Sequence, residues 1–294
     1  AELASEIFPA GVLNLVFGRG PTVGSPLVTH PKVRMVSLTG SIATGSNIIS
    51  STADSVKRMH MELGGKAPVI IFDDADIDAA VEGIRTFGFY NAGQDCTAAC
   101  RIYAQDGIYD KFVEKLGAAV ASIKYGLQDD PSTELGPLIT AQHRDRVAGF
   151  VERAVAQPHI RLVTGGKTVE GNGFFFEPTV LADAQQDDEI VRREVFGPVV
   201  SITPFSDVDT AVGWANGSME PFCSFWSSPF GRKHPPPHRQ RPRPNKSRLY
   251  PVRRRRPVVN QSSKSTPLSR QRLPLAPACS PLLPPAAPPP QTRT

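Results

Sequence analysis

Residues 61–87 read MELGGKAPVIIFDDADIDAAVEGIRTF, and this stretch contains the pattern that decides the fold. A strand candidate, Arg58–Leu63, ends at two glycines, and a second apolar run, Val69–Phe72, follows closely. The segment Ile77–Phe87 then repeats apolar residues at spacings of four and three, the period of an amphipathic helix. Short apolar strands that alternate with helices are typical of α/β proteins with a parallel sheet.

The same alternation continues on both sides of this stretch. Toward the N-terminus we expect strands at Val12–Phe17 and Val33–Leu38 and helices at Thr22–Thr29 and Ser41–Ala53. Toward the C-terminus we expect a strand at Arg101–Ala104, a helix at Tyr109–Lys124, a helix capped by Thr140 and ending near Gln157, strands at Arg161–Thr164, Val180–Leu181 and Val199–Thr203, and a helix at Val208–Ala215. About 220 residues of this kind are enough for one large or two small α/β domains.

The C-terminal part has a different composition. Residues 231–294 hold 15 basic residues, no acidic residue and 16 of the 29 prolines, whereas residues 1–230 hold 18 basic and 28 acidic residues. Formal charges of −10 and +15 therefore combine to the +5 of the whole chain. Without a hydrophobic period, the Pro/Arg-rich segment cannot offset a backbone entropy of about 1–2 kcal/mol per residue. We predict that residues 219–294 form a disordered tail.

Several classes of protein are excluded by the sequence. No run of 18 apolar residues is present, and residues 1–25 lack the pattern of a signal peptide, so we expect a cytoplasmic protein and no membrane partner. Four cysteines at this length do not form a disulfide framework. The chain opens on Ala1 within a helical pattern, so we expect it to be a fragment.

The loop NAGQDCTAACR, residues 91–101, is the strongest candidate for chemistry. Cys96 stands on a short polar turn, where flanking N–H groups favour a thiolate nucleophile. The alternative is an ordinary half-buried thiol. Cys100 has no histidine or third cysteine nearby to complete a zinc site, so we expect it in the core and expect no metal.

Two further features are compatible with catalysis and with nucleotide binding. Glu62 precedes two glycines and can act as a general base if burial raises its pKa, although a glutamate at a strand end is more often solvated. Thr39-Gly40-Ser41, with Gly45 one turn later, leads a strand into a helix whose N–H groups favour a pyrophosphate. This pattern differs from the GxGxxG fingerprint.

Together these motifs resemble the NAD(P)-dependent aldehyde dehydrogenase family. The segments LVFGRGPTVG, VSLTGSIATG, MELGGKAPVIIFDDADID, GQDCTAACR, ELGPLIT and EVFGPVV occur in the family's order, over residues 1 to about 218. The segment NAGQDCTAACRIYAQ looks most like the corresponding segment of the γ-aminobutyraldehyde (1-pyrroline) dehydrogenases, which oxidise ω-aminoaldehydes.

The resemblance implies an aldehyde dehydrogenase-like α/β fold in three parts. Residues 1–65 match the C-terminal part of a Rossmann-type dinucleotide-binding domain, residues 66–218 match the catalytic thiol domain, and residues 219–294 are the Pro/Arg-rich tail. The implied cofactor is NAD. NADP stays open, because the positions that face the adenosine 2′ group are expected upstream of Ala1.

The resemblance also implies roles for individual residues. Cys96 matches the nucleophile that forms a thiohemiacetal and then a thioester, and Glu62 matches the base that activates the deacylating water. The remaining matches concern the cofactor: Thr39, Gly40, Ser41 and Gly45 at the pyrophosphate turn, Gly18 near the adenosine half, Glu194 at the nicotinamide ribose, and Phe196 against the nicotinamide ring. The implied reaction is oxidation of an aldehyde such as 4-aminobutanal to its acid, by a homo-oligomer in the full-length family.

Asp95 is a prediction from the residues themselves. Its carboxylate adjoins the nucleophile and could attract the ammonium end of an aminoaldehyde, worth about 1 kcal/mol when exposed. The alternative is that Asp95 merely faces solvent.

The sequence also departs from the family at both ends. The family's first strands, its adenine-ribose contacts and its oxyanion-hole asparagine are expected upstream of Ala1. After Asn216 the family's later segments are missing, and Trp226–His234 is similar to the next strand and helix but one residue out of register. We hypothesise that residues from about Met219 are a frame-shifted reading of the gene.

Three classes of function fit these observations. The first is an aldehyde dehydrogenase, and the second is an inactive fragment of one. The third is a nucleic-acid binder that uses Arg253–Arg256, but residues 231–294 offer only Tyr250 for base stacking, so this class ranks last.

Overall fold

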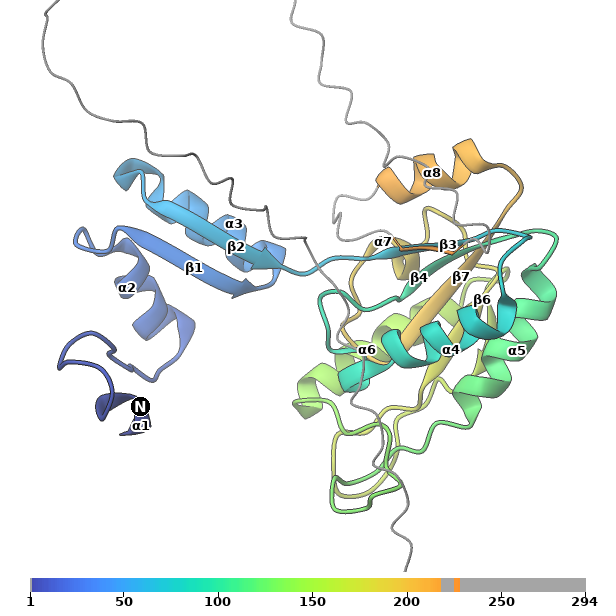
Figure 1. Cartoon of the computed structure of the whole chain (residues 1–294), viewed down its shortest axis with the longest axis horizontal. Helices are drawn as coiled ribbons and strands as arrows, with labels where there is room; N and C mark the ends of the chain where they lie inside the picture. Colours follow the sequence, from blue (N-terminus) through green and yellow to red (C-terminus); the bar gives the residue numbers. More distant parts are fainter. Residues whose placement is uncertain (1, 218–224, 228–294) are drawn as a thin grey trace, which may run out of the picture. The chain divides into compact units, whose positions relative to one another are not determined.

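The structure is a computed structural model that describes residues 2–217 and 225–227. The chain divides into two units, residues 1–234 and 235–294, and all described residues lie in the first. Within that unit the described strands form two sheets, one with two strands and one with six. Figure 1 shows that the two sheets follow each other along the chain, with β2 leading into β3.

The two-stranded sheet is a βαβ unit. Strand β1 (Met35–Gly40) leads into helix α3 (Ile42–Thr52), and a 3₁₀ turn, η2 (Ala53–Ser55), leads on to strand β2 (Arg58–Leu63). The two strands are parallel. A parallel pair needs such a crossover, and a helix is its usual form. The prediction of a strand, a helix and a strand here is confirmed, with β1 starting two residues later than expected.

The segment before β1 contains short helices and no strand. These are α1 (Glu2–Ser5), a π-helical turn η1 (Gly20–Gly24) and α2 (Ser25–Thr29). The strand predicted at Val12–Phe17 is wrong. Its apolar side chains are exposed, with Phe17 at 85 %, and no described strand pairs with it. An apolar run becomes a strand only when a neighbour supplies hydrogen bonds and a packing surface.

The six-stranded sheet has the order β5-β6-β7-β4-β3-β8. All its pairs are parallel except β5 with β6. Its strands, in chain order, are β3 (Pro68–Ile71), β4 (Arg101–Gln105), β5 (Arg161–Thr164), β6 (Thr179–Ala182), β7 (Val199–Phe205) and β8 (Phe225–Ser227). Each strand expected in this region is present. Strand β8 falls within the predicted disordered tail, and the rest of that tail lies outside the described residues.

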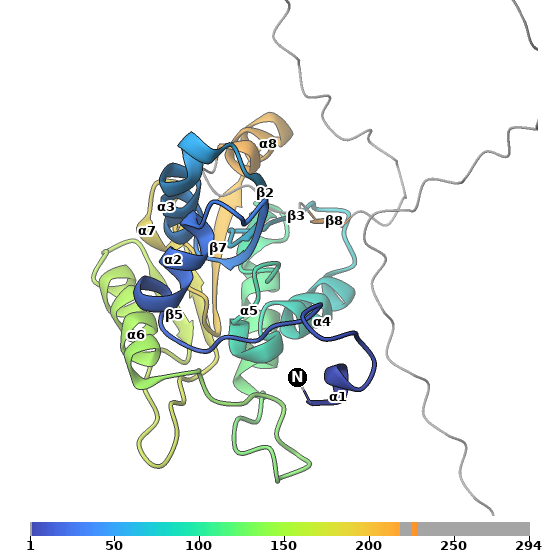
Figure 2. The same cartoon turned by 90° about the vertical axis from the view of Figure 1, so that its left-hand side faces the viewer.

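Five helices accompany this sheet, and they form two apolar clusters with it. They are α4 (Ile77–Phe87), α5 (Tyr109–Ala121), α6 (Ala141–Val155), α7 (Glu189–Arg192) and α8 (Val208–Asn216). The larger cluster joins α4, α5 and α6 to alternate residues of the strands, such as Ile102 and Ala104. The smaller cluster joins α8 to the intervening residues of the same strands, such as Ile70 and Tyr103. Because alternate residues of a strand face opposite sides, α8 covers the second face, and both views show it apart from α4, α5 and α6 (Figures 1 and 2).

Local chemistry accounts for the helix boundaries. The carboxylate of Asp76 accepts hydrogen bonds from the N–H groups of Asp78 and Ala79, so α4 begins where the sequence predicts. Thr140 caps α6 as expected, its hydroxyl accepting from the N–H of His143 at 3.1 Å. Helix α5 ends three residues earlier than expected, at Ala121. The sequence analysis missed the short helix α7 and the 3₁₀ turn η3 (Tyr90–Gly93).

Candidate active site

The turn before Cys96 is strained and tightly packed. Asn91, Ala92 and Gly93 have φ angles of 51°, 55° and 67°, the left-handed region that non-glycine residues rarely adopt. A Cβ atom on Gly93 would lie 2.0 Å from the carbonyl oxygen of Gly197, so only glycine fits there. The Asn91 side chain donates to the Gln94 carbonyl at 2.9 Å. Strained turns of this kind concentrate at functional sites.

The thiol of Cys96 is partly buried and surrounded by carboxylates. Burial is the main cause that raises its pKa, and the charge of Asp95 raises it further. A hydrogen bond from the backbone lowers the pKa, while the more weakly acting charges of Glu194 and Glu62 raise it. The thiol is therefore protonated at neutral pH in this arrangement, and it needs a base to become a nucleophile.

Asp95 also organises the loop that contains Cys96. One of its carboxylate oxygens, Oδ1, accepts hydrogen bonds from the N–H of Thr97 at 2.8 Å and from the Thr97 hydroxyl at 2.7 Å. This local turn fixes the backbone on both sides of Cys96. Asp95 therefore has a structural role here, in addition to the substrate role predicted from the sequence.

Glu62 stands at the end of β2 as part of a row of polar side chains. Its Oε1 lies 3.0 Å from Nε2 of His60, and Nδ1 of His60 lies 2.9 Å from the hydroxyl of Ser37. Residues 37 and 60 are direct partners in the β1–β2 register, as are Thr39 and Glu62. An ionised carboxylate only accepts, so Nε2 of His60 carries the hydrogen in its contact with Glu62. The sequence analysis missed His60, although its spacing of two from Glu62 places both on one strand face.

The turn from β1 into α3 has the features that a pyrophosphate requires. Ser41 caps α3, because its hydroxyl accepts from the N–H of Thr44 at 3.2 Å. The first-turn N–H groups of Ile42 and Ala43 have no acceptor within the helix and are available to an anion. Gly45 is buried, and a Cβ atom there would lie 2.8 Å from Cδ2 of Leu63. Glycine at this position allows the close helix–strand packing seen in dinucleotide-binding βαβ units.

The residues predicted at the nicotinamide end lie on the loop before β7. Oε1 of Glu194 accepts a hydrogen bond from the N–H of Gly65 at 3.1 Å. A Cβ atom on Gly64 would lie 2.1 Å from Oε2 of the same carboxylate. The two glycines after Glu62 therefore let the backbone approach Glu194. Phe196 has a φ of 58°, and its ring is 37 % exposed.

Gly18 has a local structural explanation. A Cβ atom at this position would lie 2.1 Å from Cγ2 of Val23 in η1, so glycine is needed for the packing of its own turn. Its role near the adenosine half of the cofactor stays a prediction.

The predicted residues thus fall into two groups. The charges of Asp95, Glu194 and Glu62 all act on the thiol of Cys96. The turn predicted to bind a pyrophosphate, Thr39–Ser41 with Gly45, leads into α3 and adjoins Glu62 through the register of β1 and β2.

Helix α6 adds two residues that no sequence motif indicated. Arg146 donates hydrogen bonds to the carbonyl oxygens of Val195 and Glu194, and Nε2 of His143 lies 2.6 Å from the carbonyl oxygen of Phe196. Their spacing of three in a helix is a weak signal for a shared face.

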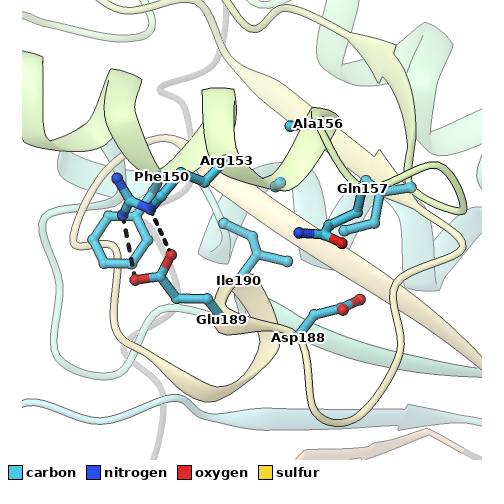
Figure 3. A pocket seen from close by; sticks show the side chains of 9 residues that line it. Phe150, Arg153, Ala156, Gln157, Asp188, Glu189 and Ile190 are labelled. Atoms are coloured by element: carbon cyan, nitrogen blue, oxygen red, sulfur yellow. Dashed lines mark hydrogen bonds and ion pairs between the residues drawn. The ribbon is translucent and has the colours of Figure 1, made fainter.

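A pocket of about 270 Å³ lies away from these residues, between the C-terminal half of α6 and α7. Figure 3 shows the guanidinium of Arg153 turned toward the carboxylate of Glu189, 2.7 Å from Nε to Oε2. Asp188, also in the lining, bonds through Oδ2 to Nε2 of His159 at 2.9 Å. These charges are paired with each other, so the pocket offers no reactive group.

Residues 2–217 and 225–227 contain neither a metal-binding cluster nor a helix that could span a membrane. There, no group of three or more histidine, cysteine or acidic side chains is gathered as a metal would require. The helices of that part of the chain are too short or too polar for one to cross a bilayer.

Comparison with known proteins gives consistent results. A sequence model described as the aldehyde dehydrogenase family matches residues 1–221. Lactaldehyde dehydrogenase from Escherichia coli K12 is 44 % identical over 220 residues, which are 74 % of this chain and 46 % of that protein. A probable succinate-semialdehyde dehydrogenase [NADP(+)] from Sinorhizobium fredii is 43 % identical over 220 residues, 74 % of this chain and 44 % of the relative.

A solved structure gives the same picture. Betaine aldehyde dehydrogenase from Staphylococcus aureus in complex with NAD⁺ has a TM-score of 0.75 and 39 % sequence identity, and the match covers 78 % of this chain and 46 % of that one. The chain therefore spans about half the length of the relatives that it matches.

Proposed function

This chain belongs to the aldehyde dehydrogenase family, and from that premise we propose that it carries the nucleophile, the base and the pyrophosphate-binding turn of an enzyme that oxidises an aldehyde to a carboxylic acid. One observation supports this most directly. Cys96 follows a strained turn, and the carboxylates of Glu194 and Glu62 both act on its thiol. A structural thiol needs neither feature.

The residues present fit NAD as the cofactor. The N-terminus of α3 with its Ser41 cap offers unpaired N–H groups to a pyrophosphate, and Glu194 offers a carboxylate to a ribose hydroxyl. When bound, the cofactor supplies the acceptor for a hydride. NAD is proposed over NADP by likeness to the NAD⁺ complex, although one relative is named for NADP(+).

Cys96 performs the first step. Its thiol first loses its proton to solvent water. The resulting thiolate attacks the carbonyl carbon of the aldehyde, a carbon–sulfur bond forms, and the carbonyl oxygen becomes the oxyanion of a thiohemiacetal. The backbone N–H of Cys96 is the donor that we propose for that oxygen. Loss of hydride from the same carbon oxidises it and leaves a thioester on Cys96.

Glu62 performs the second step. Its carboxylate takes a proton from water, the oxygen of which attacks the thioester carbon, and the carbon–sulfur bond breaks to release the acid and the Cys96 thiolate. His60 holds Oε1 of Glu62 at 3.0 Å, so the other oxygen is left for the water. The exposed position of Glu62 at the strand end gives water access.

The proposal is tested with the full chain and a panel of aldehydes. Wild type should form NADH and the corresponding acid with at least one of lactaldehyde, succinate semialdehyde, betaine aldehyde and 4-aminobutanal. Cys96→Ser should abolish acid formation, whereas Cys100→Ala, which changes a buried thiol four residues away, should retain it. Mass spectrometry should detect an acyl group on Cys96 in Glu62→Gln. Product formation by Cys96→Ser at the wild-type rate would refute the assignment.

A second candidate is an inactive fragment. Only three residues of segment 2–56, Val36, Gly45 and Thr52, are buried, so the βαβ unit has little core of its own. If this candidate is correct, no aldehyde in the panel yields NADH, and isothermal titration detects no binding of NAD. If the chain binds NAD and oxidises no aldehyde, it lacks a catalytic step and not the cofactor site.

For the substrate we propose an ω-aminoaldehyde such as 4-aminobutanal. This proposal is supported by the similarity of residues 91–105 to the γ-aminobutyraldehyde dehydrogenases and by the partly buried carboxylate of Asp95 beside the nucleophile. Asp95→Asn should raise KM for 4-aminobutanal more than KM for a neutral aldehyde of equal length. The amide still accepts from the N–H of Thr97, so the loop is kept. Equal changes in both KM values would exclude a charge-based role.

We further propose a cytoplasmic location and a homo-oligomeric assembly for the whole protein, by likeness to the family. Sedimentation of the purified chain tests the assembly.

A further inference from the structure

The first two turns of α6 hold the loop that contains Glu194 and Phe196. Arg146 donates from Nη1 to the carbonyl oxygen of Val195 at 2.5 Å and from Nη2 to that of Glu194 at 2.9 Å. Its guanidinium carbon lies 4.9 Å from the centre of the Phe150 ring in the same helix. A planar guanidinium that binds two successive carbonyls fixes their direction as well as their distance.

His143 holds the next residue of this loop. Its Nε2 lies 2.6 Å from the carbonyl oxygen of Phe196, and the two rings meet edge to face with centroids 6.1 Å apart. Because a carbonyl oxygen only accepts, Nε2 carries the hydrogen. Phe196 has a φ of 58°, a conformation that persists only where the surroundings fix it. Helix α6 therefore fixes the backbone of three successive residues.

The same loop packs against the turn before the nucleophile. A Cβ atom on Gly197 would lie 2.6 Å from Cγ2 of Val147 in α6, and one on Gly93 would lie 2.0 Å from the carbonyl oxygen of Gly197. The Val147 side chain of α6 therefore packs on residue 197, and the backbone of residue 197 lies close to that of Gly93. A displacement of the loop relative to α6 is consequently transmitted to the backbone three residues before Cys96.

We propose that Arg146 and His143 are positioning residues that set the placement of the Cys96 thiol relative to the Glu194 carboxylate. Neither side chain needs to touch a substrate, since both act through backbone carbonyls. The meaning of this placement for catalysis rests on the proposed function. The placement itself is a property of the folded chain and can be measured without turnover.

The experiment uses the full chain with Cys223→Ser and Cys279→Ser, which leaves Cys96 as the accessible thiol because Cys100 is buried. Two quantities are measured for each variant. Hydrogen exchange by mass spectrometry compares peptides that cover residues 91–97 and 193–198 with one that covers β4. The rate of Cys96 alkylation by iodoacetamide is recorded as a function of pH.

Four variants are compared with this parent. Arg146→Met removes both bonds to the loop, His143→Leu removes the third, and His143→Gln keeps an N–H donor. Arg144→Met is the matched control, because Arg144 is two residues away in α6 and its guanidinium bonds to the carboxylate of Asp145 at 2.9 Å.

Arg146→Met should raise exchange in both loop peptides and leave β4 unchanged. Because burial raises the pKa of Cys96, a less tightly held thiol should have a lower pKa. Its alkylation at neutral pH should then be faster, by about threefold for each fall of half a pKa unit. His143→Leu should act in the same direction, while His143→Gln and Arg144→Met should resemble the parent.

The proposal is overturned if Arg146→Met leaves both loop peptides at the parent's exchange rate. It is also overturned if exchange rises equally in β4, since that result shows general destabilisation. If His143→Gln and His143→Leu show the same exchange and alkylation rates, the hydrogen bond from His143 does not position the loop. A chain that shows the expected exchange but oxidises no aldehyde refutes the proposed function and leaves the positioning role standing.

Discussion

Two pairs of parallel strands in this chain have the same backbone pairing and opposite burial. In β3 and β4 the residues are buried on both faces, with Ile70, Ile71 and Ile102 at 0 % exposure. In β2 the residues alternate between exposed and partly buried, and in β1 Val36 is the one buried residue, while Met35 is 55 % exposed. Parallel strands are normally covered on both faces by helices. The predicted catalytic part therefore has its own core, whereas the predicted cofactor part in this chain has little.

Because of this difference, the residues proposed for catalysis are divided between a well-packed part of the chain and a poorly packed part. The thiol loop lies beside β4 and is held by contacts with buried elements, such as Gly93 against Gly197. Glu62, the proposed base, and the proposed pyrophosphate turn lie on the poorly covered unit, where Glu62 keeps 48 % of its side chain exposed. Substitutions of one residue type in the two regions should therefore differ in their effect on stability.

The largest difference is expected for phenylalanine. Phe112 in α5 is 0 % exposed and Phe17 is 85 % exposed. Phe112→Ala should lower the free energy of unfolding by about 3–5 kcal/mol, because burial of the ring is lost and a cavity remains. Phe17→Ala should change it by less than about 0.5 kcal/mol.

Urea denaturation followed by circular dichroism measures both phenylalanine variants. A loss of stability in Phe17→Ala comparable to that in Phe112→Ala would show that the N-terminal segment has a core of its own, and the comparison would fail.

A smaller difference is expected for glycine. Gly93 has a φ of 67° and no space for a Cβ atom, whereas nothing lies within 4 Å of a Cβ atom on Gly20. Gly93→Ala should cost about 1–3 kcal/mol of backbone strain, with a further steric contribution. Gly20→Ala should be neutral or stabilise by about 0.4–1 kcal/mol, since alanine restricts the unfolded chain.

The glycine comparison also has a local readout. Gly93→Ala should change the alkylation rate of Cys96, and Gly20→Ala should not. Thermal unfolding of both variants gives the sign of each effect, and a neutral Gly93→Ala would contradict the tight contact with Gly197.

The sequence predicted the catalytic part of the fold well because its signals are local. The spacing of four and three in Ile77–Phe87 and the cap at Thr140 are properties of neighbouring residues, and both elements begin where expected. The strand predicted at Val12–Phe17 failed because a strand depends on a partner, which no local pattern reveals.

The candidate site was predictable only where a motif or a strand end marked it. Cys96, Glu62 and Glu194 stand in such segments, and the thiol responds to both carboxylates. Arg146 and His143 were missed because they act on backbone carbonyls about 50 residues away, a relation that depends on tertiary packing.

Removal of a helix cap should lower the global free energy of unfolding by about 1 kcal/mol more in α6 than in α3. The hydroxyls of Thr140 and Ser41 cap α6 and α3 at 3.1 and 3.2 Å. Thr140→Ala should lower the global free energy of unfolding, because α6 buries five of its residues in the core. Ser41→Ala should leave the global value within about 0.5 kcal/mol and raise only local hydrogen exchange in α3, which buries Gly45 and Thr52 alone. A global loss in Ser41→Ala would mean that both regions unfold together.

The smallest effects concern the pKa of Cys96, and they test whether the two regions meet at the thiol. The charge of Asp95, in the same loop, raises this pKa more than that of Glu62, on the other sheet. Removing a nearby negative charge stabilises the thiolate, so the pKa falls and alkylation at neutral pH becomes faster. We expect a rise of about two- to fivefold in Asp95→Asn and a smaller rise in Glu62→Gln, because screening weakens the more distant charge.

The pH profile of Cys96 alkylation distinguishes this electrostatic effect from a change in access. A lower pKa moves the profile to lower pH and leaves the rate at high pH unchanged, whereas greater access raises the rate at every pH. A shift in Asp95→Asn together with none in Glu62→Gln would show that the poorly covered unit does not hold its base near the thiol in solution. Because the proposed deacylation needs that proximity, this result would also explain a chain that forms a thioester on Cys96 and cannot release it.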